Sequence, residues 1–301
     1  MIKRIIKGIR NPKKILLFLL NLRLSNFIPD KIYLKIKFYL LMGKKLDLEN
    51  PKTFNEKLQW LKIYDHNPKY SDLVDKYEVR QYISKILGED YLIPLIGVYN
   101  SYDEIDFDSL PNQFVLKPNH TSGDIFICKN KNDINHEALK KEINKWIKRE
   151  YYWLHREWPY KNIEPKIICE KLIIDESGED LKDYKVMCFN GEPKCIFVCI
   201  DRHTPTGLKI NFYDTDWNLM PFKRHYPNSE KMIAKPKNFE KMIEFSKVLS
   251  RDFPFVRVDF YEVNDHLYFG ELTFYPGAGF EEFEPEEYDK ILGDWIKLPF
   301  R

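Results

Sequence analysis

The sequence lacks the residue spacings that mark most metal centres and disulfide frameworks. Its five cysteines include no C-x-x-C pair, and its seven histidines include no H-x-x-x-H pair. Most of the cysteines fall in apolar runs, which is typical of reduced, buried thiols in a cytosolic protein. The sequence therefore argues against a zinc site and against a fold held together by disulfides.

The sequence also lacks a long apolar run. The longest in the first 45 residues, residues 15–20, is far shorter than the ~20 residues that a membrane-spanning helix needs. Basic residues precede this run as in a secretory signal, but no small-residue cleavage site follows Leu20, so we do not expect a signal peptide. With neither internal repeats nor low-complexity tracts, the 301 residues leave room for one large domain or two modest ones.

Charged residues are plentiful, but they are unevenly distributed. Residues 1–45 contain 12 Lys or Arg and a single acid, Asp30, whereas the rest of the chain contains 36 bases and 45 acids. In this basic arm the charges alternate with Ile, Leu and Phe at helical spacing. Two interpretations are open: an amphipathic helix on an anionic membrane surface, or a helical pair that packs its apolar face on the body. We expect a cytoplasmic protein, peripheral on the inner face of the membrane in the first case, with no nucleic-acid partner.

Local patterns predict an α+β fold. Thr53 and Glu56 have the spacing of a capping box at the start of a helix, and a second helix is predicted over residues 71–87. After Pro111 the pattern is a strand, a loop and a second strand, and residues 214–238 look irregular. Further strands and helices are indicated over residues 93–99, 135–157, 166–173, 184–189, 194–200, 209–214 and 239–252.

The C-terminal stretch 255–274 is predicted to be a β-hairpin. Residues 255–261 alternate and are rich in Val and Phe, as in a strand, and Asn264-Asp265 has turn chemistry. Residues 267–274 then form the returning strand. An antiparallel hairpin with a polar outer face would be enough to explain this pattern.

The polar side chains of this hairpin also suit a metal–phosphate site. Side chains two apart on a strand share a face, so Arg257 lies beside Asp259, and Glu271 lies beside Thr273. Mg²⁺ prefers oxygen ligands and usually takes one or two carboxylates plus substrate phosphates, and Asp259 and Glu271 offer such carboxylates. Arg257 would stabilise the negative charge that develops next to them.

A second candidate site follows the strand that ends at Lys117. The backbone N–H groups of a Ser/Gly loop, here residues 118–124, can surround phosphate oxygens, and a lysine adds positive charge. Gly123 supplies conformational freedom in this loop. A lone lysine at a strand end is more often an ordinary surface residue, so the order of the motifs along the chain has to carry the argument.

That order resembles the ATP-grasp superfamily: Lys76 comes first, then Lys117 with its loop, then Glu170, and finally the hairpin at 255–274. More closely, the chain resembles the teichuronopeptide-biosynthesis (TupA-like) branch of that superfamily, from about residue 45 to about residue 298. The stretches that carry this resemblance are PKTFNEKLQWLK, DKYEVRQYI, FVLKPNHTSG, REWPYKNIEPKII, DYKVMCFNGEPK, RVDFY and YFGELTFYPGAG.

The resemblance implies a nucleotide site next to a metal site. In the family, two lysines contact the nucleotide phosphates, a small loop closes over them, the backbone after an acidic strand end meets adenine, and two terminal acids bind Mg²⁺. The residues that match the nucleotide site are Lys76, Lys117, His120, Ser122, Gly123, Glu170, Lys171, Leu172 and Ile173. Those that match the metal ligands and the catalytic cations are Asp259, Glu271, Thr273, Arg257 and Lys185.

The chain departs from the family pattern at two positions. Thr273 stands where asparagine is usual, and it offers a hydroxyl rather than an amide carbonyl to a metal. Thr121 replaces the first glycine of the usual Asn-His-Gly-Ser-Gly loop, which would stiffen the loop without removing its phosphate contacts.

The resemblance also implies an architecture and an activity. The expected architecture is an ATP-grasp fold, in which two α+β subdomains clasp ATP, with a basic helical extension before it. We expect boundaries at 1–50 (arm), 51–110 (N-terminal subdomain), 111–175 (phosphate-loop subdomain) and 176–301 (metal-binding subdomain). The implied activity is an ADP-forming carboxylate–amine ligase that works through an acyl phosphate. Its partners would be ATP, an amine, and a uronic acid or glycan of a bacterial surface polysaccharide.

Other interpretations compete with a ligase. The D-x-D of Asp214 and Asp216 matches the metal-binding pair of many glycosyltransferases, but such a short pattern is more often a turn. Arg156 and Glu157 suit an acidic substrate or, equally, a structural ion pair. A membrane-associated scaffold with a degenerate ATP fold, and a kinase that stops after phosphoryl transfer, are the remaining alternatives.

Overall fold

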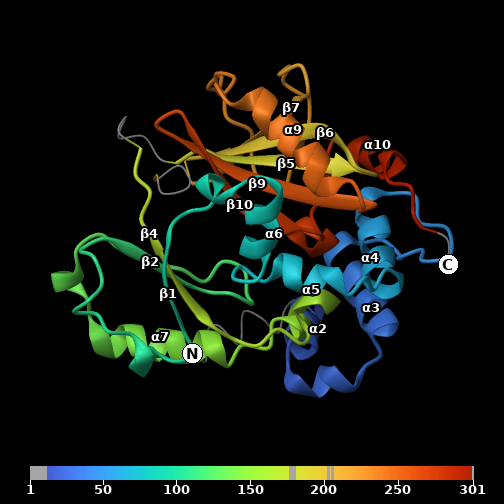
Figure 1. The fold of residues 1–301 in the computed structure, drawn as a ribbon. Helices are drawn as coiled ribbons and strands as arrows, with labels where there is room; N and C mark the ends of the chain where they lie inside the picture. Colours follow the sequence, from blue (N-terminus) through green and yellow to red (C-terminus); the bar gives the residue numbers. More distant parts are fainter. Residues whose placement is uncertain (1–11, 176–180, 202–203, 205–206, 300–301) are drawn as a thin grey trace.

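The computed structural model describes residues 12–175, 181–201, 204 and 207–299. The first eleven residues of the predicted arm lie outside these ranges. The described chain forms two main antiparallel sheets in different parts of the molecule, with helices packed around both of them (Figure 1). The α+β class expected from the sequence is confirmed.

The larger sheet has five strands in the order β10-β9-β5-β6-β7. Two of its inner strands, β5 and β9, are almost entirely buried. Helix α9, predicted over residues 239–252, covers one face of this sheet (Figure 1). The bounds are β5 Asp183–Phe189, β6 Glu192–Ile200, β7 Lys209–Asp214, β9 Phe255–Val263, β10 His266–Thr273 and α9 Phe239–Ser250.

The smaller sheet has four strands in the order β1-β4-β2-β3 and its own hydrophobic core. Helix α7 lies along this sheet (Figure 1) and contributes Leu139, Ile143 and Trp146 to that core. Strand β4 is in the middle of the sheet, between β1 and β2. The bounds are β1 Leu95–Tyr99, β2 Phe114–Pro118, β3 Phe126–Cys128, β4 Ile167–Lys171 and α7 His136–Ile147.

Helices from both ends of the chain surround the larger sheet. Helix α4 begins with the predicted capping box, in which Thr53 and Glu56 each bond the other's backbone N–H. It packs on α10 at the other end of the chain, where Asn55 donates a hydrogen bond to Asp289 over 3.0 Å. The helices are α2 Pro12–Leu20, α3 Asp30–Met42, α4 Phe54–Tyr64, α5 Lys69–Val74, α6 Val79–Ile86, α8 Tyr152–His155 and α10 Glu287–Trp295.

Short elements complete the described fold. Two of them, β8 Lys223–Arg224 and β11 Phe283–Glu284, pair with each other, so the segment predicted to be irregular contains one short strand. The 3-10 helices are η1 Arg23–Phe27, η2 Glu89–Tyr91, η3 Tyr102–Glu104, η4 Lys131–Asp133, η5 Trp158–Tyr160 and η6 Pro276–Gly279.

Two helix predictions were wrong in extent. The predicted helix over residues 71–87 is divided into α5 and α6, because the side chain of Asp75 accepts hydrogen bonds from the backbone N–H groups of Tyr77 and Glu78. Such local side-chain bonds compete with helical ones. Lys76 therefore lies in a turn between helices and not within a helix. The pattern over 135–157 is similarly divided into α7 and α8.

Two further findings concern the cysteines and the lengths of the apolar helices. The five cysteines are buried and form no disulfide, as expected from their apolar surroundings. Among the described helices, none combines the length and apolar character required to cross a membrane.

Candidate active site

The predicted hairpin brings its charged side chains into one network. Arg257 on β9 donates to Asp259 through Nε and Nη2, each over 2.6 Å, and donates through the same Nη2 to Glu271 on β10 over 2.9 Å. Asp259 is almost completely buried, whereas the Glu271 side chain is 34% exposed. One guanidinium thus holds both carboxylates that the sequence assigned to a metal.

A β-bulge sets the position of Glu271. Phe269 pairs with Phe260 and Leu272 pairs with Val258, so Gly270 and Glu271 together face the single residue Asp259. A Cβ added at Gly270 would lie 3.1 Å from the Asp259 carbonyl oxygen, which is why a residue without a side chain fits there. Bulges commonly re-aim a side chain beside an active site, and this bulge turns Glu271 towards Arg257.

The neighbouring strand β5 adds Lys185 to the network. Its Nζ contacts Asp259 and lies 2.7 Å from Asp183. Burial would lower the pKa of Lys185, but the charges of Asp259 and Asp183 raise it above its usual value. Lys185 therefore stays protonated, as the cation that the sequence analysis placed at this site.

The electrostatics of Glu271 differ from those of Asp259. Burial alone would raise the pKa of Glu271, but the charges of Arg257, Lys76 and Lys185 lower it to about 2. Burial raises the pKa of Asp259, and Arg257 and Lys185 oppose that change. At neutral pH the Glu271 carboxylate is therefore ionised, and a third of its side chain is open to solvent.

Thr273 lies where the sequence analysis placed it, next to Glu271. Its hydroxyl donates to the Glu271 carboxylate over 3.2 Å. Within the described ranges, no group of three or more His, Cys, Asp and Glu side chains is arranged to hold a metal ion. The oxygen donors gathered around Arg257 and Thr273 are thus the two carboxylates of Asp259 and Glu271 and one hydroxyl.

The smaller sheet carries a second charged cluster around Glu170 on β4. Lys117 on β2 lies 2.6 Å from its carboxylate, and Arg80 on α6 lies 3.2 Å from it. Val115 on β2 pairs with Glu170 on β4. Lys117 lies two residues after Val115, so its side chain is on the same face of the sheet as those of Val115 and Glu170. Glu170 therefore orients Lys117 at the end of β2, where the loop begins.

Lys76 connects the two clusters. Its backbone N–H donates to the Asn119 carbonyl over 3.1 Å, and its Nζ donates to the Thr121 carbonyl. Burial lowers the pKa of Lys76, and the charge of Glu271 opposes that shift more than any other group does. The lysine of the α5–α6 turn thus lies on the loop of the smaller sheet and within electrostatic reach of the hairpin on the larger sheet.

The loop after β2 is anchored at its start and open at its tip. Asn119 donates to Asp75 over 2.8 Å, and His120 is buried with a lowered pKa caused by that burial. Ser122 and Gly123 are exposed, and Gly123 has a φ of +87° with open space where a Cβ would be. The exposed Ser-Gly tip has the conformational freedom that a phosphate loop needs.

The strand end assigned to adenine lies at the exit of β4. Lys171 is the last residue of the strand and is exposed, while Leu172 and Ile173 follow it without regular structure and are half-buried. The Lys171 N–H donates to the Pro94 carbonyl over 3.0 Å. The predicted contact of this segment with adenine stays a prediction.

Three residues of the site were missing from the sequence analysis. Asp183 pairs with Lys185, Arg80 pairs with Glu170, and Tyr151 hydrogen-bonds Ser122 at the loop tip. The signal for Asp183 was available, because it lies two residues before Lys185 on the same strand. Arg80 and Tyr151 come from elements whose packing only the tertiary structure defines.

Two other candidate functional residues, Asp214 and Arg156, take part in structural contacts away from these clusters. Asp214 ends β7 and accepts hydrogen bonds from the N–H groups of Asp216 and Asn218 over 2.9 and 2.8 Å, so the D-x-D forms a turn. The Arg156 side chain is fully buried and donates to the Ser25 carbonyl over 2.8 Å. Arg156 therefore holds the N-terminal arm and has a structural role, as one of the two interpretations expected.

Comparison with known proteins places the chain in a family. The sequence model of the TupA-like ATP-grasp family matches residues 56–297, most of the chain. The chain therefore belongs to the TupA-like ATP-grasp family, as its motifs indicated. A search of curated proteins found no significant match.

Solved structures of ATP-grasp ligases are similar to the chain at low sequence identity. D-alanine–D-alanine ligase from Bacillus anthracis, complexed with ATP, has a TM-score of 0.43 and 15% identity, over 74% of this chain and 63% of that one. The ATP-grasp ligase PsnB, complexed with a phosphomimetic variant of its minimal precursor, Mg and ADP, has a TM-score of 0.42 and 11% identity, over 79% and 63%. The chain thus spans less than two thirds of either ligase.

Proposed function

We propose that the protein is an ATP-dependent carboxylate–amine ligase. It would phosphorylate a substrate carboxylate to an acyl phosphate, which an amine then attacks with release of phosphate. The carboxylate would belong to a uronic acid of a bacterial surface polysaccharide or its precursor, a substrate class that comes from the family resemblance alone. Membership of the TupA-like ATP-grasp family supports the ligase class.

The observation that carries the proposal is the position of Lys76 between the two charged clusters. Its Nζ lies on the Thr121 carbonyl of the loop after β2, and its charge lowers the pKa of Glu271 on the hairpin. Phosphates held between the loop and the hairpin would therefore meet cations from both sheets. Phosphoryl transfer depends mainly on such positioning and charge neutralisation.

Each cation then has a role that follows from its surroundings. Lys117, oriented by Glu170, binds phosphate at the loop side. Arg257 lies between Asp259 and Glu271 and stabilises negative charge on the acyl phosphate and on the later tetrahedral oxyanion. Lys185 keeps Asp259 in place from the neighbouring strand.

The donor set fits Mg²⁺. Asp259 and Glu271 contact the same Arg257 nitrogen, and the Thr273 hydroxyl is bonded to Glu271, so hard oxygen donors are gathered at one place. One or two carboxylates, completed by substrate phosphates, are what a Mg²⁺ ion usually takes in proteins. When bound, the ion would neutralise phosphate charge, and Asp259, Glu271 and Thr273 would hold it.

A glycosyltransferase is less well supported. Such an enzyme would need Asp214 and Asp216 to face a sugar nucleotide, but the Asp214 carboxylate is bonded to the backbone of its own turn. Asp259, Glu271, Lys76 and Lys117 are all present, which also disfavours a degenerate scaffold.

The proposal is tested by ADP release from ATP and Mg²⁺ over a panel of uronic acids crossed with amines. ADP should appear only when a matching acid and amine are both present, and Asp259→Asn should remove most of this activity. Asp214→Asn, at a half-buried acid on the same sheet, is the matched control and should retain activity. ADP release with the acid alone would indicate a kinase, and release of a nucleoside diphosphate from a sugar nucleotide would indicate a glycosyltransferase.

A further inference from the structure

The N-terminal arm exposes large apolar side chains that the body leaves uncovered. Helix α2 buries only Leu20, and Phe18 of this helix is 65% exposed. In η1, Leu24 is 77% exposed and Phe27 is 88% exposed. We name as the arm face the exposed apolar residues of α2 and η1: Ile15, Leu16, Phe18, Leu19, Leu22, Leu24 and Phe27.

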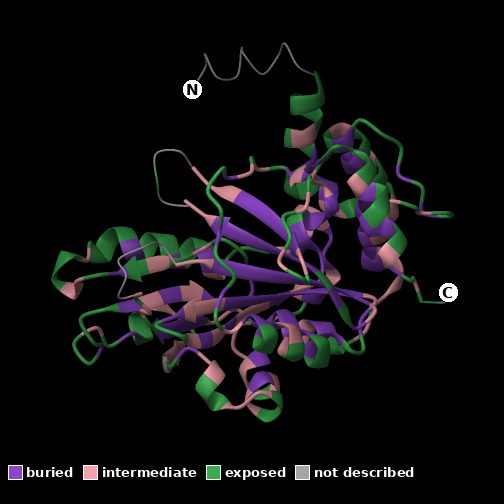
Figure 2. Cartoon of the chain, turned by 90° about the horizontal axis from the view of Figure 1, so that it is seen from above, coloured by how far each residue is buried: buried purple, intermediate pink, exposed green. Residues whose placement is uncertain are grey.

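The arm face is distinct from the packed part of the arm. Helix α3 buries Tyr33, Leu34 and Phe38 against the body, with none of the three more than 2% exposed. By contrast, α2 projects from the body with exposed surface on most of its length (Figure 2). Helix α3 therefore packs on the body, as one of the two interpretations of the sequence expects, whereas the apolar side chains of the arm face remain uncovered. A group of large, exposed apolar side chains of this kind is typical of an interaction site.

The arm face has a fixed orientation. Arg156 donates to the Ser25 carbonyl over 2.8 Å, Tyr152 donates to the carboxylate of Asp30, and Tyr33 donates to the Leu154 carbonyl over 3.0 Å. The body segment 152–156 thus holds the arm at η1 and at the first turn of α3. An interface can form on such a surface without first ordering it.

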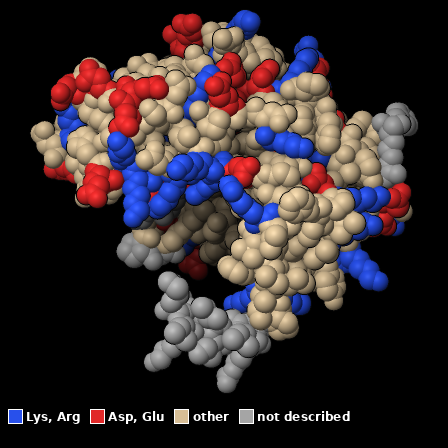
Figure 3. Space-filling model, turned by 90° about the horizontal axis from the view of Figure 1, so that it is seen from below, with Lys and Arg blue, Asp and Glu red and all other residues tan. Residues whose placement is uncertain are grey.

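Positive charge surrounds the arm face. Lys13 and Lys14 on α2 and Arg23 on η1 are exposed, and Asp30, the sole acid in residues 1–45, is already bonded to Tyr152 and Arg156. Seen from below, a band of Lys and Arg side chains borders a hollow on the molecule (Figure 3).

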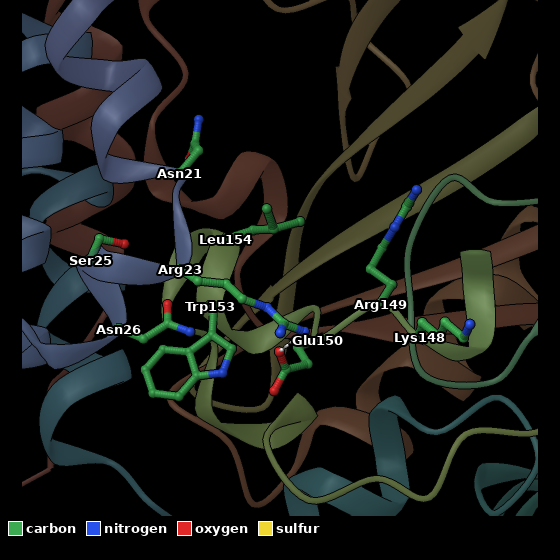
Figure 4. A pocket seen from close by; sticks show the side chains of 9 residues that line it. All are labelled: Asn21, Arg23, Ser25, Asn26, Lys148, Arg149, Glu150, Trp153 and Leu154. Atoms are coloured by element: carbon green, nitrogen blue, oxygen red, sulfur yellow. Dashed lines mark hydrogen bonds and ion pairs between the residues drawn. The ribbon is translucent and has the colours of Figure 1, made fainter. Parts of the chain in front are cut away.

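A cavity of about 440 Å³ lies between η1 and the body segment 148–154, beside the arm face. Its lining includes Lys148 and Arg149, and Arg23 reaches across it to Glu150 at 3.4 Å (Figure 4). Glu150 is the one acid among the residues that line this cavity, so positive charge continues from the arm onto the body.

We propose that the arm face docks on the surface of an anionic lipid bilayer, with its apolar side chains inserted and the surrounding lysines and arginines against the headgroups. Apolar residues flanked by Lys and Arg are the composition of interfacial helices, and anionic leaflets attract basic segments. A second copy of the chain is a poorer occupant, because a two-fold contact through this face would bring the basic residues of both copies together. The proposal stands independently of the ligase activity.

Sedimentation of the purified full-length chain with lipid vesicles tests the proposal. The chain should pellet with vesicles of phosphatidylcholine and phosphatidylglycerol at low salt, stay in solution with phosphatidylcholine alone, and be partly released by 1 M salt, where the screening length falls to about 3 Å. Leu24→Ser with Phe27→Ser should lower the bound fraction about ten-fold or more, since both side chains would lose their burial in the bilayer. Lys13→Glu with Lys14→Glu should remove the preference for anionic vesicles.

Two matched controls distinguish docking from general stickiness. Met232→Ser with Leu219→Ser removes apolar side chains that are 98% and 57% exposed on the body, and vesicle binding should not change. Lys231→Glu with Lys237→Glu reverses two exposed body charges, whose side chains are 76% and 74% exposed, and should also have no effect.

The proposal is overturned if the wild-type chain does not bind anionic vesicles at low salt. It is also overturned if the Leu24/Phe27 variant pellets like the wild type, or if that variant instead changes the mass of the protein in solution, which would make the face a contact between copies.

Discussion

Both sheets hold buried carboxylates next to cations, but the two clusters are built in opposite ways. On the smaller sheet one acid, Glu170, is 6% exposed and holds two cations, Lys117 and Arg80. On the larger sheet the Arg257 guanidinium, which Lys185 assists, holds two acids, and Glu271 remains 34% exposed. Under the proposed function this difference corresponds to separate roles for the two sheets: the smaller sheet would present cations to phosphate, and the larger sheet would present oxygen donors to a metal.

The largest effect is expected from breaking the larger-sheet cluster. Asp259→Asn or Glu271→Gln replaces a charged carboxylate by a neutral amide, which binds a metal ion more weakly, so turnover should fall about 100- to 1000-fold. ADP release under saturating ATP measures this. The fold should survive in both variants, which far-ultraviolet circular dichroism checks. Normal turnover in either variant would make the metal assignment wrong.

A smaller effect is expected from the cations on the loop side. Lys117→Met and Lys76→Met each remove a charged group directed at phosphate, and contacts to charged groups contribute about 1.5–3 kcal/mol. ATP affinity measured by calorimetry should therefore fall about ten-fold or more in each variant. Lys231→Met, far more exposed at 76%, serves as the control and should bind ATP normally. Unchanged affinity in both lysine variants would count against the nucleotide site.

The charge environment of Glu271 predicts a pH dependence of stability. Its pKa falls from 4.5 to about 2 in the fold, because Arg257, Lys76 and Lys185 outweigh the effect of burial. A lowered folded-state pKa stabilises the fold above the unfolded-state pKa, and this stabilisation is lost as the pH falls from about 4.5 towards about 2. Urea unfolding at pH 6 and pH 3 should show a larger loss for the wild type than for Glu271→Gln. Equal losses of stability would mean that those cations do not lower the pKa of Glu271.

The smallest effects are expected outside the two clusters or where chemistry is conserved. Thr273→Asn restores the residue usual in the family and keeps a donor towards Glu271, so turnover should change less than about three-fold. Asp214→Ala removes only the hydrogen bonds of a turn, each typically about 1 kcal/mol of stability, and should leave turnover unchanged. Complete loss of turnover in Asp214→Ala with ATP binding intact would revive the glycosyltransferase.

Whether a structural feature could be predicted from the sequence depends on whether residues close to one another along the chain determine it. The α4 capping box and the β9–β10 hairpin follow from residues close in sequence, and both were predicted correctly. The break at Lys76 was missed because the Asp75 side chain competes with helical hydrogen bonds, and an uninterrupted periodic pattern does not reveal that competition.

The site shows the same limit. Strand alternation placed Arg257 with Asp259 and Glu271 with Thr273, and both contacts are present. Alternation did not reveal that the bulge at Gly270 brings Glu271 onto Arg257, although a glycine inside a strand is a signal for such a bulge. The grip of Arg156 on the arm joins segments more than a hundred residues apart, and no local pattern encodes it.

Calorimetry of ATP binding with and without Mg²⁺ tests the proposed roles of the two sheets most directly. If the smaller sheet supplies cations for phosphate and the larger sheet supplies the metal ligands, Mg²⁺ should strengthen ATP binding to the wild type and to Lys117→Met. The same ion should add little to Asp259→Asn, which should still bind ATP without metal. An Asp259→Asn variant whose ATP affinity rises with Mg²⁺ as much as that of the wild type would contradict the account.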